Sequence, residues 1–239
     1  MKMYKTDLHI HTCLSPCADL DMAPKYIVKE AKKKGIDIAG ICDHNSCENV
    51  PAVKKSFEKE GLNVIGGMEI TSNEEVHVLA LFDNEEKLFS MQQVIYDNLY
   101  GINNAKRFGE QVVVNEEDEV IGFNEKLLIG ATELSIETIV NKIHELGGLA
   151  IAAHIDREGY SIISQLGFIP RGLQLDAVEV SRADKTGDFT DLSLPIITSS
   201  DAHELNEIGS SFTRFFMEDV NLEEMKKCLL GKDGRKVII

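Results

Sequence analysis

Apolar and polar residues alternate near the start of the chain, in Asp7-Leu8-His9-Ile10-His11-Thr12. A period of two predicts a short strand with Leu8 and Ile10 on one face and Asp7, His9 and His11 on the other. The two imidazoles would then lie side by side and point the same way. Such a pair can bind one metal ion and leave coordination positions open, although a surface strand with two histidines has the same pattern. The rest of the chain must decide between these interpretations.

Helical and apolar segments alternate after this strand. An amphipathic helix over about 23–34 ends at Gly35, and the near-continuous apolar run over 36–41 predicts a strand that is buried on both faces. A helix over about 51–59 and a strand that begins at Leu62 come next. This β-α-β-α-β order predicts a parallel α/β barrel, in which the loops that leave the carboxyl ends of the strands meet at one mouth.

The middle of the chain interrupts this alternation. A strand over 76–82 carries His77 near its beginning, residues 85–108 have a helical pattern, and residues 112–128 have the pattern of a hairpin. We interpret residues from about 85 to 132 as a modest insertion on a single barrel domain over 1–239. Alternation then resumes with a helix capped by Ser135, strands over 149–154, 176–180 and 194–199, a helix over 222–230 and a short strand over 237–239.

Composition and charge narrow the classes of function. The net charge is −15, from 40 acidic and 25 basic residues. Extended binding to nucleic acid draws on a basic surface that neutralises phosphates, so nucleic acid is a less favoured partner. No apolar run approaches the roughly 18 residues of a membrane helix, and the N-terminus lacks the apolar stretch of a secretion signal. We therefore expect a cytoplasmic protein without a membrane partner.

The chain has five cysteines, an odd number that suits free thiols in a cytoplasmic protein. Cys13, Cys17, Cys42 and Cys47 lie close together in the sequence, with spacings of C-x3-C and C-x4-C. These spacings differ from the tight C-x2-C pattern of many zinc and iron–sulfur sites. An all-cysteine metal cluster is therefore a less favoured interpretation.

Most of the histidines lie at or next to the predicted ends of strands, and acidic residues lie in similar places. His144, inside a predicted helix, is interpreted as an ordinary helix residue. Imidazoles and carboxylates that meet at one mouth would desolvate one another and repel protons, which bound divalent cations would relieve. Because one catalytic zinc uses only three or four protein ligands, the number of groups predicts two or three metal ions with a bridging carboxylate. The groups are His9, His11, His44, His77, His154, His203, Glu69 and Asp201, and Asp43 directly precedes His44.

Six short segments, taken in their order along the chain, resemble the polymerase-and-histidinol-phosphatase (PHP) family of metal-dependent phosphoesterases. They are D-L-H-I-H-T, C-D-H-N, G-M-E-I, E-V-H-V-L, A-A-H-I-D and S-S-D-A-H. The resemblance covers nearly the whole chain apart from the middle insertion. It implies an α/β fold, a distorted (β/α)7 barrel with the metal site at the C-terminal ends of the strands. It also implies up to three bound ions, commonly zinc, manganese or iron.

The resemblance further implies a role for each candidate residue. Asp43 would orient or polarise the site from behind the ligands, as a carboxylate beside a ligand histidine commonly does, and we count it as a candidate catalytic residue. One ion would be held by His9, His11, Glu69 and Asp201, a second by His44 and His203, and a third by His77 and His154, with Glu69 bridging to the first.

Cys17 departs from the family pattern. Many family members have a histidine or aspartate ligand of the second ion at this place, whereas this chain has Cys17, with Asp19 and Asp21 just beyond. A thiolate is a competent ligand for zinc or iron and a poor one for magnesium or manganese. Ligation by Cys17 would therefore shift the metal preference to zinc or iron. The alternative is a buried free cysteine, which often packs as a small apolar residue.

The predicted ions supply a route to phosphoester hydrolysis. Two ions about 3.5–4 Å apart can turn a bridging water into hydroxide and hold a phosphoryl oxygen, so no protein nucleophile is needed. Arginine suits bidentate binding of the phosphate. Arg157 follows His154 by three residues and resembles the arginine of the A-H-P-x-R segment in nucleotide-cleaving relatives, although Ile155 replaces the proline. Arg182 and Arg171 are further candidates for substrate binding, with an ordinary surface position as the alternative.

We therefore predict a metal-dependent phosphoesterase that hydrolyses a small phosphorylated metabolite or a nucleotide. Two alternatives stay open. An exonuclease-like phosphodiesterase acting on single-stranded ends would need a basic or aromatic track, of which a chain with no tryptophan and a net charge of −15 offers little. A metal-holding regulatory module without catalysis would show a loss of ligands, and only Cys17 hints at that.

Overall fold

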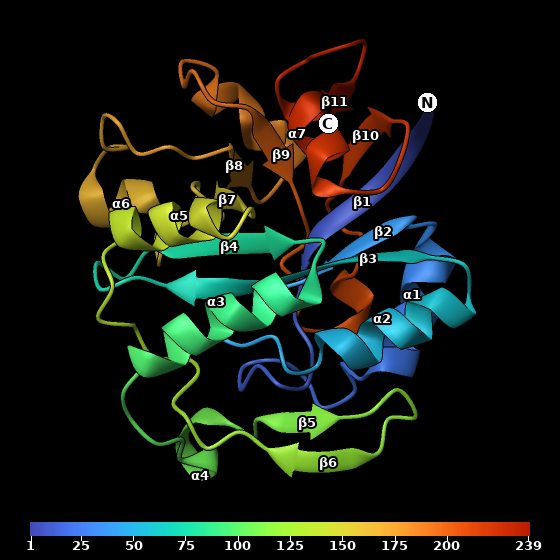
Figure 1. The fold of residues 1–239 in the computed structure, drawn as a ribbon, viewed down its shortest axis with the longest axis vertical. Coiled ribbons are helices and arrows are strands. Elements are labelled where there is room, and N and C mark those ends of the chain that lie inside the picture. Colours follow the sequence, from blue (N-terminus) through green and yellow to red (C-terminus); the bar gives the residue numbers. More distant parts are fainter.

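A computed structural model describes residues 1–239. One nine-stranded sheet forms its centre, and a separate two-stranded sheet lies at one end of the molecule (Figure 1). The strands are β1 (Lys2–Ile10), β2 (Ile38–Ile41), β3 (Asn63–Thr71), β4 (His77–Phe82), β5 (Val112–Val114), β6 (Val120–Phe123), β7 (Leu149–Ala152), β8 (Ala177–Val180), β9 (Ile196–Thr198), β10 (Thr213–Met217) and β11 (Lys236–Ile238). The order in the large sheet is β11-β10-β1-β2-β3-β4-β7-β8-β9, and β5 pairs with β6.

The helices cover the outer face of the strands. Gly35, with a φ of 68°, ends the first helix as predicted, and Ser135 caps the fifth by accepting from the amide of Thr138. None of the helices is long and apolar enough to cross a membrane. They are α1 (Pro24–Lys34), α2 (Val50–Lys59), α3 (Glu85–Asp97), α4 (Ala105–Phe108), α5 (Ile136–Glu145), α6 (Ile162–Leu166) and α7 (Leu222–Leu229), and the 3-10 helices are η1 (Ala183–Phe189) and η2 (Leu205–Glu207).

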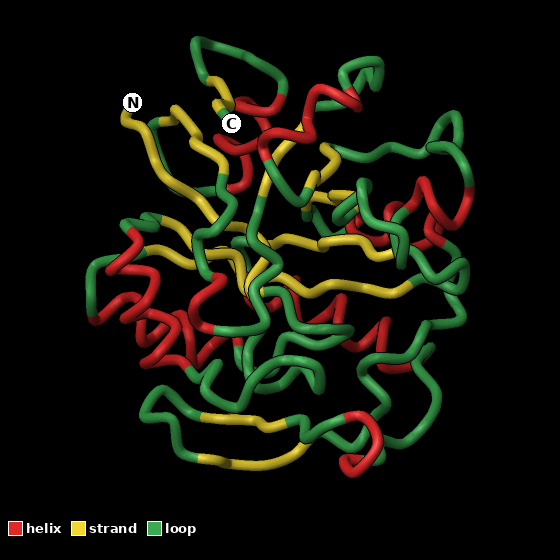
Figure 2. The backbone as a smooth tube through the Cα atoms, turned by 180° about the vertical axis from the view of Figure 1, so that it is seen from behind, coloured by secondary structure: helices red, strands yellow, loops and turns green.

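Seven strands, β1 to β4 and β7 to β9, form a nearly closed barrel, which confirms the predicted fold class. The barrel closes beyond β9, where the amide of His11 donates to the carbonyl of Ala202 at 2.9 Å and the amide of Ala202 donates to the carbonyl of His9 at 3.2 Å. The N-terminal part of β1, from Lys2 to Thr6, pairs with β10 in the antiparallel direction. β10 also pairs with β11, which forms the edge of the sheet. The barrel strands run through the middle of the backbone trace, whereas the two strands of the small sheet lie at its lower edge (Figure 2).

One strand of the barrel runs against the others. β4 is antiparallel to both β3 and β7, whereas the other neighbouring barrel strands are parallel. The expectation of a purely parallel barrel is therefore wrong at β4. Residues 72–76 are too few for the crossover that parallel strands need, but they suffice for a hairpin. Because of this reversal, His77, the first residue of β4, pairs with Thr71, the last residue of β3, and lies at the mouth.

The inner face of the barrel changes from apolar to polar along each strand. On β3, Ile65 belongs to the inner apolar cluster, and the period of two carries Gly67 and then Glu69 onto the same face. On β4 the same face holds Leu79 and then His77. Gly67 has no room for a side chain, because a Cβ there would lie 2.8 Å from Cys42 Sγ. An apolar floor therefore supports a polar mouth.

The segment between β4 and β7 is only partly outside the barrel. Leu88, Met91 and Ile95 of α3 are buried in the cluster that joins the strands to the outer helices, so α3 belongs to the barrel wall. The helical pattern predicted over 85–108 is broken in the structure, because α3 ends at Asp97 and α4 is separate. The β5–β6 hairpin follows, as the pattern over 112–128 predicted. α6 and β10 were not predicted.

Candidate metal centre

Glu69 lies at the centre of the candidate site. Its carboxylate is 1% exposed, and Oε1 lies 2.7 Å from Nδ1 of His77 and 3.0 Å from Nε2 of His154. Oε2 lies 3.0 Å from Nδ1 of His44 and 3.5 Å from Nε2 of His11. A single carboxylate that faces nitrogen atoms from several strand ends has the arrangement that a bridging metal ligand needs.

His9, His11 and Asp201 lie on one side of Glu69. The Nε2 atoms of the two imidazoles are 3.1 Å apart. Oδ1 of Asp201 lies 3.2 Å from Nε2 of His9 and 3.1 Å from Nε2 of His11. His9 on β1 and His11 just after it lie on one face, as the alternation predicts, and Asp201 lies on the segment that closes the barrel against β1. Together with Glu69 these residues offer four ligand atoms that all lie within 4.8 Å of one another.

Cys17 lies on the outer side of His44. Its Sγ is 3.2 Å from Nε2 of His44, and the residue is exposed, so it does not have the burial that the alternative of a buried free cysteine expects. Although the residue as a whole is exposed, surrounding protein shields its sulfur from water and so opposes ionisation, but hydrogen bonds from His203 and His44 lower the pKa of Cys17 to about 6. The thiolate, which is the form that binds metals, is therefore accessible near neutral pH. Two further groups of ligand atoms overlap with the first: His11, His44 and His203, and also His44, Glu69 and His77.

The groups of the cluster shift each other's pKa values in opposite directions. Burial disfavours a charged imidazole, yet nearby carboxylates, chiefly Asp201, raise the pKa of His9 well above its usual range. Burial and the neighbouring His203 hold the pKa of His11 well below its usual range. Although burial opposes it, the surrounding imidazoles hold the pKa of Glu69 well below its usual range. Gain or loss of protons therefore leaves some groups of the cluster in an unfavourable charge state, whereas bound divalent cations would balance the negative charge of the carboxylates.

The backbone is strained where three strands deliver these groups. Asn45, His154 and Asp201 have positive φ angles of 51°, 28° and 51°, a region that residues other than glycine rarely adopt. Each lies at, or directly after, a residue of the cluster that follows a barrel strand. Strain of this kind persists only where the surrounding structure enforces it and is concentrated at functional sites.

Glu179 was not predicted from the sequence, but the structure places it inside the site. It is 1% exposed, and its Oε1 lies 3.0 Å from Nδ1 of His9 and accepts from the amide of His154 at 3.1 Å. The signal in the sequence was a charged residue between Val178 and Val180 in a strand that is otherwise apolar. An acid there is rarely buried without a partner.

The carboxylate of Asp43 reaches the imidazoles of the cluster through Ser15. Its buried carboxylate accepts from the amide and the hydroxyl of Thr12, both at 2.7 Å, and from Oγ of Ser15 at 2.7 Å. Oγ of Ser15 in turn lies 2.8 Å from Nδ1 of His11. Burial raises the pKa of Asp43. The carboxylate does not line the cavity, and its contact with Ser15 is compatible with the orienting role expected of Asp43.

A cavity of 300 Å³ opens over the cluster. Arg157 lines it and forms an ion pair with Asp201, and the ring of Tyr160 stacks on His77 with 4.5 Å between the ring centroids. Ile129, from the segment after β6, lines the cavity as well. The remaining lining residues are His44, Glu69, His154, Gly159 and His203.

The other candidate arginines lie elsewhere. Arg182 is exposed, forms an ion pair with Asp184 and lines a different cavity, so the structure does not bring it to the candidate metal centre. Arg171 is exposed and does not line the cavity over the cluster. His144 has the ordinary role expected, since its Nε2 lies 2.8 Å from Oδ2 of Asp176 on the outside of the barrel.

The donor set suits divalent metal ions. Imidazole nitrogens and carboxylate oxygens are ligands for zinc, manganese and iron. Nδ1 of His154 and Oε2 of Glu179 are buried without a hydrogen-bond partner, and such atoms are costly unless a charge or an ion lies nearby. A buried His, Glu and Asp cluster able to hold metal ions is therefore present.

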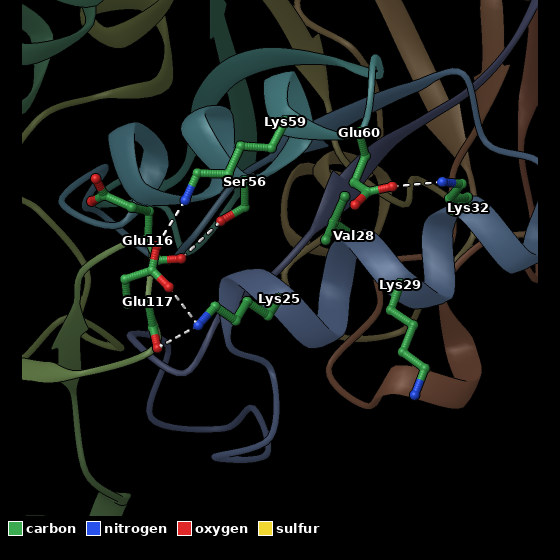
Figure 3. Close-up of a pocket in the computed structure, with 9 residues that line it drawn as sticks. All are labelled: Lys25, Val28, Lys29, Lys32, Ser56, Lys59, Glu60, Glu116 and Glu117. Carbon is green, nitrogen blue, oxygen red and sulfur yellow. Dashed lines mark hydrogen bonds and ion pairs between the residues drawn. The ribbon is translucent and has the colours of Figure 1, made fainter.

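A second, larger cavity of 490 Å³ lies between α1, α2 and the tip of the β5–β6 hairpin (Figure 3). Most of its charged groups form ion pairs, because Glu117 binds both Lys25 and Lys59, and Glu60 binds Lys32. None of the groups of candidate metal ligands lies there. The ion pairs hold the hairpin tip against the two helices.

Comparison with protein families gives two matches. Residues 7–157 match the model of the PHP domain, and residues 189–227 match the model described as PHP-associated. The chain is 31% identical over 188 residues to an uncharacterized protein of Methanocaldococcus jannaschii, a match that covers 75% of this chain and 82% of that protein. It is 25% identical over 190 residues to a 5'-3' exoribonuclease of Haemophilus influenzae, covering 63% of this chain and 68% of the enzyme.

Solved structures share the fold at low sequence identity. The lesion-specific endonuclease Q of Pyrococcus furiosus matches 100% of this chain with a TM-score of 0.73 and 22% identity. Endonuclease Q bound to a 27-mer duplex with an abasic lesion matches 98% of it with a TM-score of 0.74 and 23% identity. The chain spans only 58% of either endonuclease. From the two family matches and the archaeal relative, we conclude that the chain belongs to the PHP domain family, whose members are metal-dependent hydrolases of phosphoester bonds.

Proposed function

We propose that this protein hydrolyses the phosphoester of a small phosphorylated metabolite or nucleotide, using two or three divalent ions held by the cluster. The observation that carries the proposal is the central position of Glu69 among three overlapping groups of candidate ligands, directly below a cavity of 300 Å³. A cavity of this size is at the lower end of the range for small-molecule sites. It suits a phosphate with one compact substituent.

The ligand sets proposed here follow the contacts. The first ion would take His9, His11, Asp201 and Glu69, which form one compact group. A third ion would take His77 and His154, with Glu69 shared, since Oε1 of Glu69 lies within 3.0 Å of a nitrogen of both. The second ion would take His44 and His203, and Cys17 would complete its set from the outer side of His44.

The chain's own residues would orient the substrate. When bound, the ions would acidify a water and withdraw charge from the phosphoryl group. Arg157 lies beside them with its side chain 43% exposed, so its guanidinium can donate to phosphate oxygens from the open side of the cavity. Ser15 and Glu179 hold the imidazoles of His11 and His9 from behind. Tyr160 and Ile129 form the apolar part of the wall.

The experiment that tests the proposal combines metal analysis with a substrate panel. Metal content of the purified chain should be two to three ions per chain. The panel contains an aryl phosphate, nucleoside monophosphates and aliphatic sugar phosphates, each with added manganese or zinc. Hydrolysis that disappears in the His9→Ala variant supports the proposal. Fewer than two ions in the folded chain, or full occupancy with no turnover of any phosphoester, would contradict it.

A second candidate function is the cleavage of nucleic acid, and the likeness to the exoribonuclease of Haemophilus influenzae favours it. The net charge of −15 argues against a long nucleic-acid track. Single-stranded RNA and DNA oligonucleotides with labelled 5' ends, added to the same panel, separate the two functions. Preference for an oligonucleotide over a mononucleotide by kcat/KM would favour the nuclease.

A further inference from the structure

Glu179 joins two sides of the candidate metal centre. Its Oε1 lies 3.0 Å from Nδ1 of His9 on β1 and accepts from the amide of His154, just beyond β7, at 3.1 Å. Its main-chain carbonyl also accepts from the amide of Ile155 at 2.8 Å. Glu179 itself lies on β8 and is buried. One residue therefore connects three strands of the barrel beneath the mouth.

The contact with His9 determines which ring nitrogen faces the proposed ions. Because Nδ1 faces Glu179, Nε2 faces Oδ1 of Asp201 at 3.2 Å and Oε1 of Glu69 at 3.4 Å. A carboxylate behind a ligand imidazole keeps the proton on the ring nitrogen that faces the carboxylate, here Nδ1, and fixes the orientation of the ring. The side chain of Glu179 therefore reserves Nε2 of His9 for a metal ion.

The contacts with the main chain support His154. This residue has a φ of 28°, which is unfavourable for a residue other than glycine. Glu179 accepts from the amides of His154 and Ile155, one with its side chain and one with its carbonyl. The turn that results places Nε2 of His154 at 3.0 Å from Oε1 of Glu69.

We propose that Glu179 is a positioning residue that couples the first and third ion sites, orienting His9 with its carboxylate and holding the turn at His154. The inference rests on the proposed function, because it takes both histidines as metal ligands. Oε2 of Glu179 is buried without a hydrogen-bond partner. A buried carboxylate in that state needs positive charge nearby, and bound cations would supply it.

Two substitutions separate the charge of Glu179 from its reach. Glu179→Gln keeps the length and an acceptor oxygen but loses the charge. Glu179→Asp keeps the charge but is one methylene too short to reach His9. The matched control is Asp176→Asn, because Asp176 also accepts from an imidazole, His144, and from a main-chain amide, yet it lies outside the cluster.

The measurements are zinc affinity, by competition with a chromophoric chelator, and the absorption spectrum of the cobalt-loaded protein. We expect Glu179→Asp to weaken one or two of the ions by about 10- to 100-fold, the cost typical of losing a partner behind a ligand. It should also change the cobalt spectrum, because the geometry at His9 changes. Glu179→Gln should lie between this variant and the wild type, and Asp176→Asn should match the wild type.

Three results decide against the inference or its basis. Wild-type affinities and spectra in both Glu179 variants would overturn it. An equal loss of metal in Asp176→Asn would also overturn it, because the effect would then be a general loosening of the fold. Fewer than two ions in the wild-type chain would instead contradict the proposed function. If Glu179→Asp does not fold, the comparison of Glu179→Gln with Asp176→Asn decides.

Discussion

The cavity over the metal centre and the cavity between α1, α2 and the hairpin are both rich in charged groups, but only the first has the features of a reaction site. The cavity between α1, α2 and the hairpin is the larger, at 490 Å³ against 300 Å³. Each of its glutamates forms an ion pair with at least one lysine, as Glu117 does with the exposed Lys25 and Lys59 (Figure 3). The smaller cavity has at its base buried groups that lie at the ends of barrel strands, among them Glu69, His77 and His154. Its central carboxylate, Glu69, faces imidazole nitrogens of His44, His77 and His154 and has no lysine or arginine as an ion-pair partner.

The difference shows that neither the size of a cavity nor its number of charges marks a site. What marks it is a set of buried groups that do not satisfy one another. In the metal centre, Nδ1 of His154 and Oε2 of Glu179 have no partner, and three residues hold strained backbone angles. In the lysine-lined cavity each carboxylate has an ammonium partner. Variants in both cavities can test this comparison.

The largest expected effect is that of Glu69→Gln. An amide cannot bridge cations as a carboxylate does, so kcat/KM should fall by more than the roughly 100-fold that loss of an outer partner can cost. The matched control is Glu116→Gln in the lysine-lined cavity, which should leave kcat/KM unchanged. Both variants would be assayed with the best substrate of the panel. Equal kcat/KM values in the two variants would show that Glu69 takes no part in the reaction.

Removal of the metal ions by a chelator should lower the stability of the folded chain. Added salt without a chelator should not lower it in the same way. A ligand present at 100 times its Kd stabilises the folded state by about 2.7 kcal/mol per site. A strong chelator should therefore lower the melting temperature in differential scanning fluorimetry, and zinc or manganese should restore it. An unchanged melting temperature after complete chelation would mean that no tightly bound ion contributes to the fold.

Arg157→Ala should weaken binding of the phosphate without removing the ions. A hydrogen bond to a charged group contributes about 1.5–3 kcal/mol, so kcat/KM should fall by about 10- to 100-fold, mostly through KM. Arg157→Lys should recover only part of this loss, because lysine lacks the planar fork. Arg182→Ala serves as the control, since Arg182 lies outside the cavity. A similar loss in Arg182→Ala would contradict the assignment.

Cys17→Ser should change the identity of the bound metal more than the number of ions bound per chain. A thiolate favours zinc and iron, and a hydroxyl does not. The hydrogen bonds from His203 and His44 that lower the pKa of Cys17 to about 6 make the thiolate available. In competition experiments the variant should retain less zinc relative to manganese than the wild type. An unchanged ratio would show that the thiol does not bind the ion.

The smallest effect is expected in the lysine-lined cavity. Lys59→Ala removes one of the two partners of Glu117 and should lower the melting temperature only slightly, because exposed ion pairs contribute little. The difference from the wild type should vanish near 1 M salt, where the screening length is about 3 Å. A large loss that persists in high salt would show that this cavity is more than a contact between the hairpin and the helices.

The fold class and the positions of most histidines could be predicted because they depend on local patterns. Alternation in β1 places His9 and His11 on one face, and buried strands before His44 and His154 lead to the same mouth. The direction of β4 could not be read in this way. Direction depends on the length of a connection and on the neighbouring strands, and the apolar pattern of a strand is the same both ways.

Side chains that act at a distance along the chain were harder to predict. Glu179 contacts His9 across 170 residues of sequence, so no local spacing joins them. Arg182 follows a strand end as Arg157 does, but its guanidinium turns to Asp184 two residues on. Proximity to a strand end is therefore not enough to assign a substrate contact, because local ion pairs compete for the same side chain.

The reversal of β4 has a consequence for how this enzyme could diversify. β4 ends at the rim of the barrel opposite the mouth, so α3 runs back toward the mouth. The chain between α3 and α5 changes direction at the mouth, where the amide of Thr132 donates to the carbonyl of Thr71 at the end of β3. Ile129 of this excursion lines the cavity, and Asn45 anchors it through the carbonyl of Leu128. None of the proposed metal ligands lies in it. Lengthening or replacing this one segment would alter which substrates enter while leaving the inherited chemistry of the barrel intact.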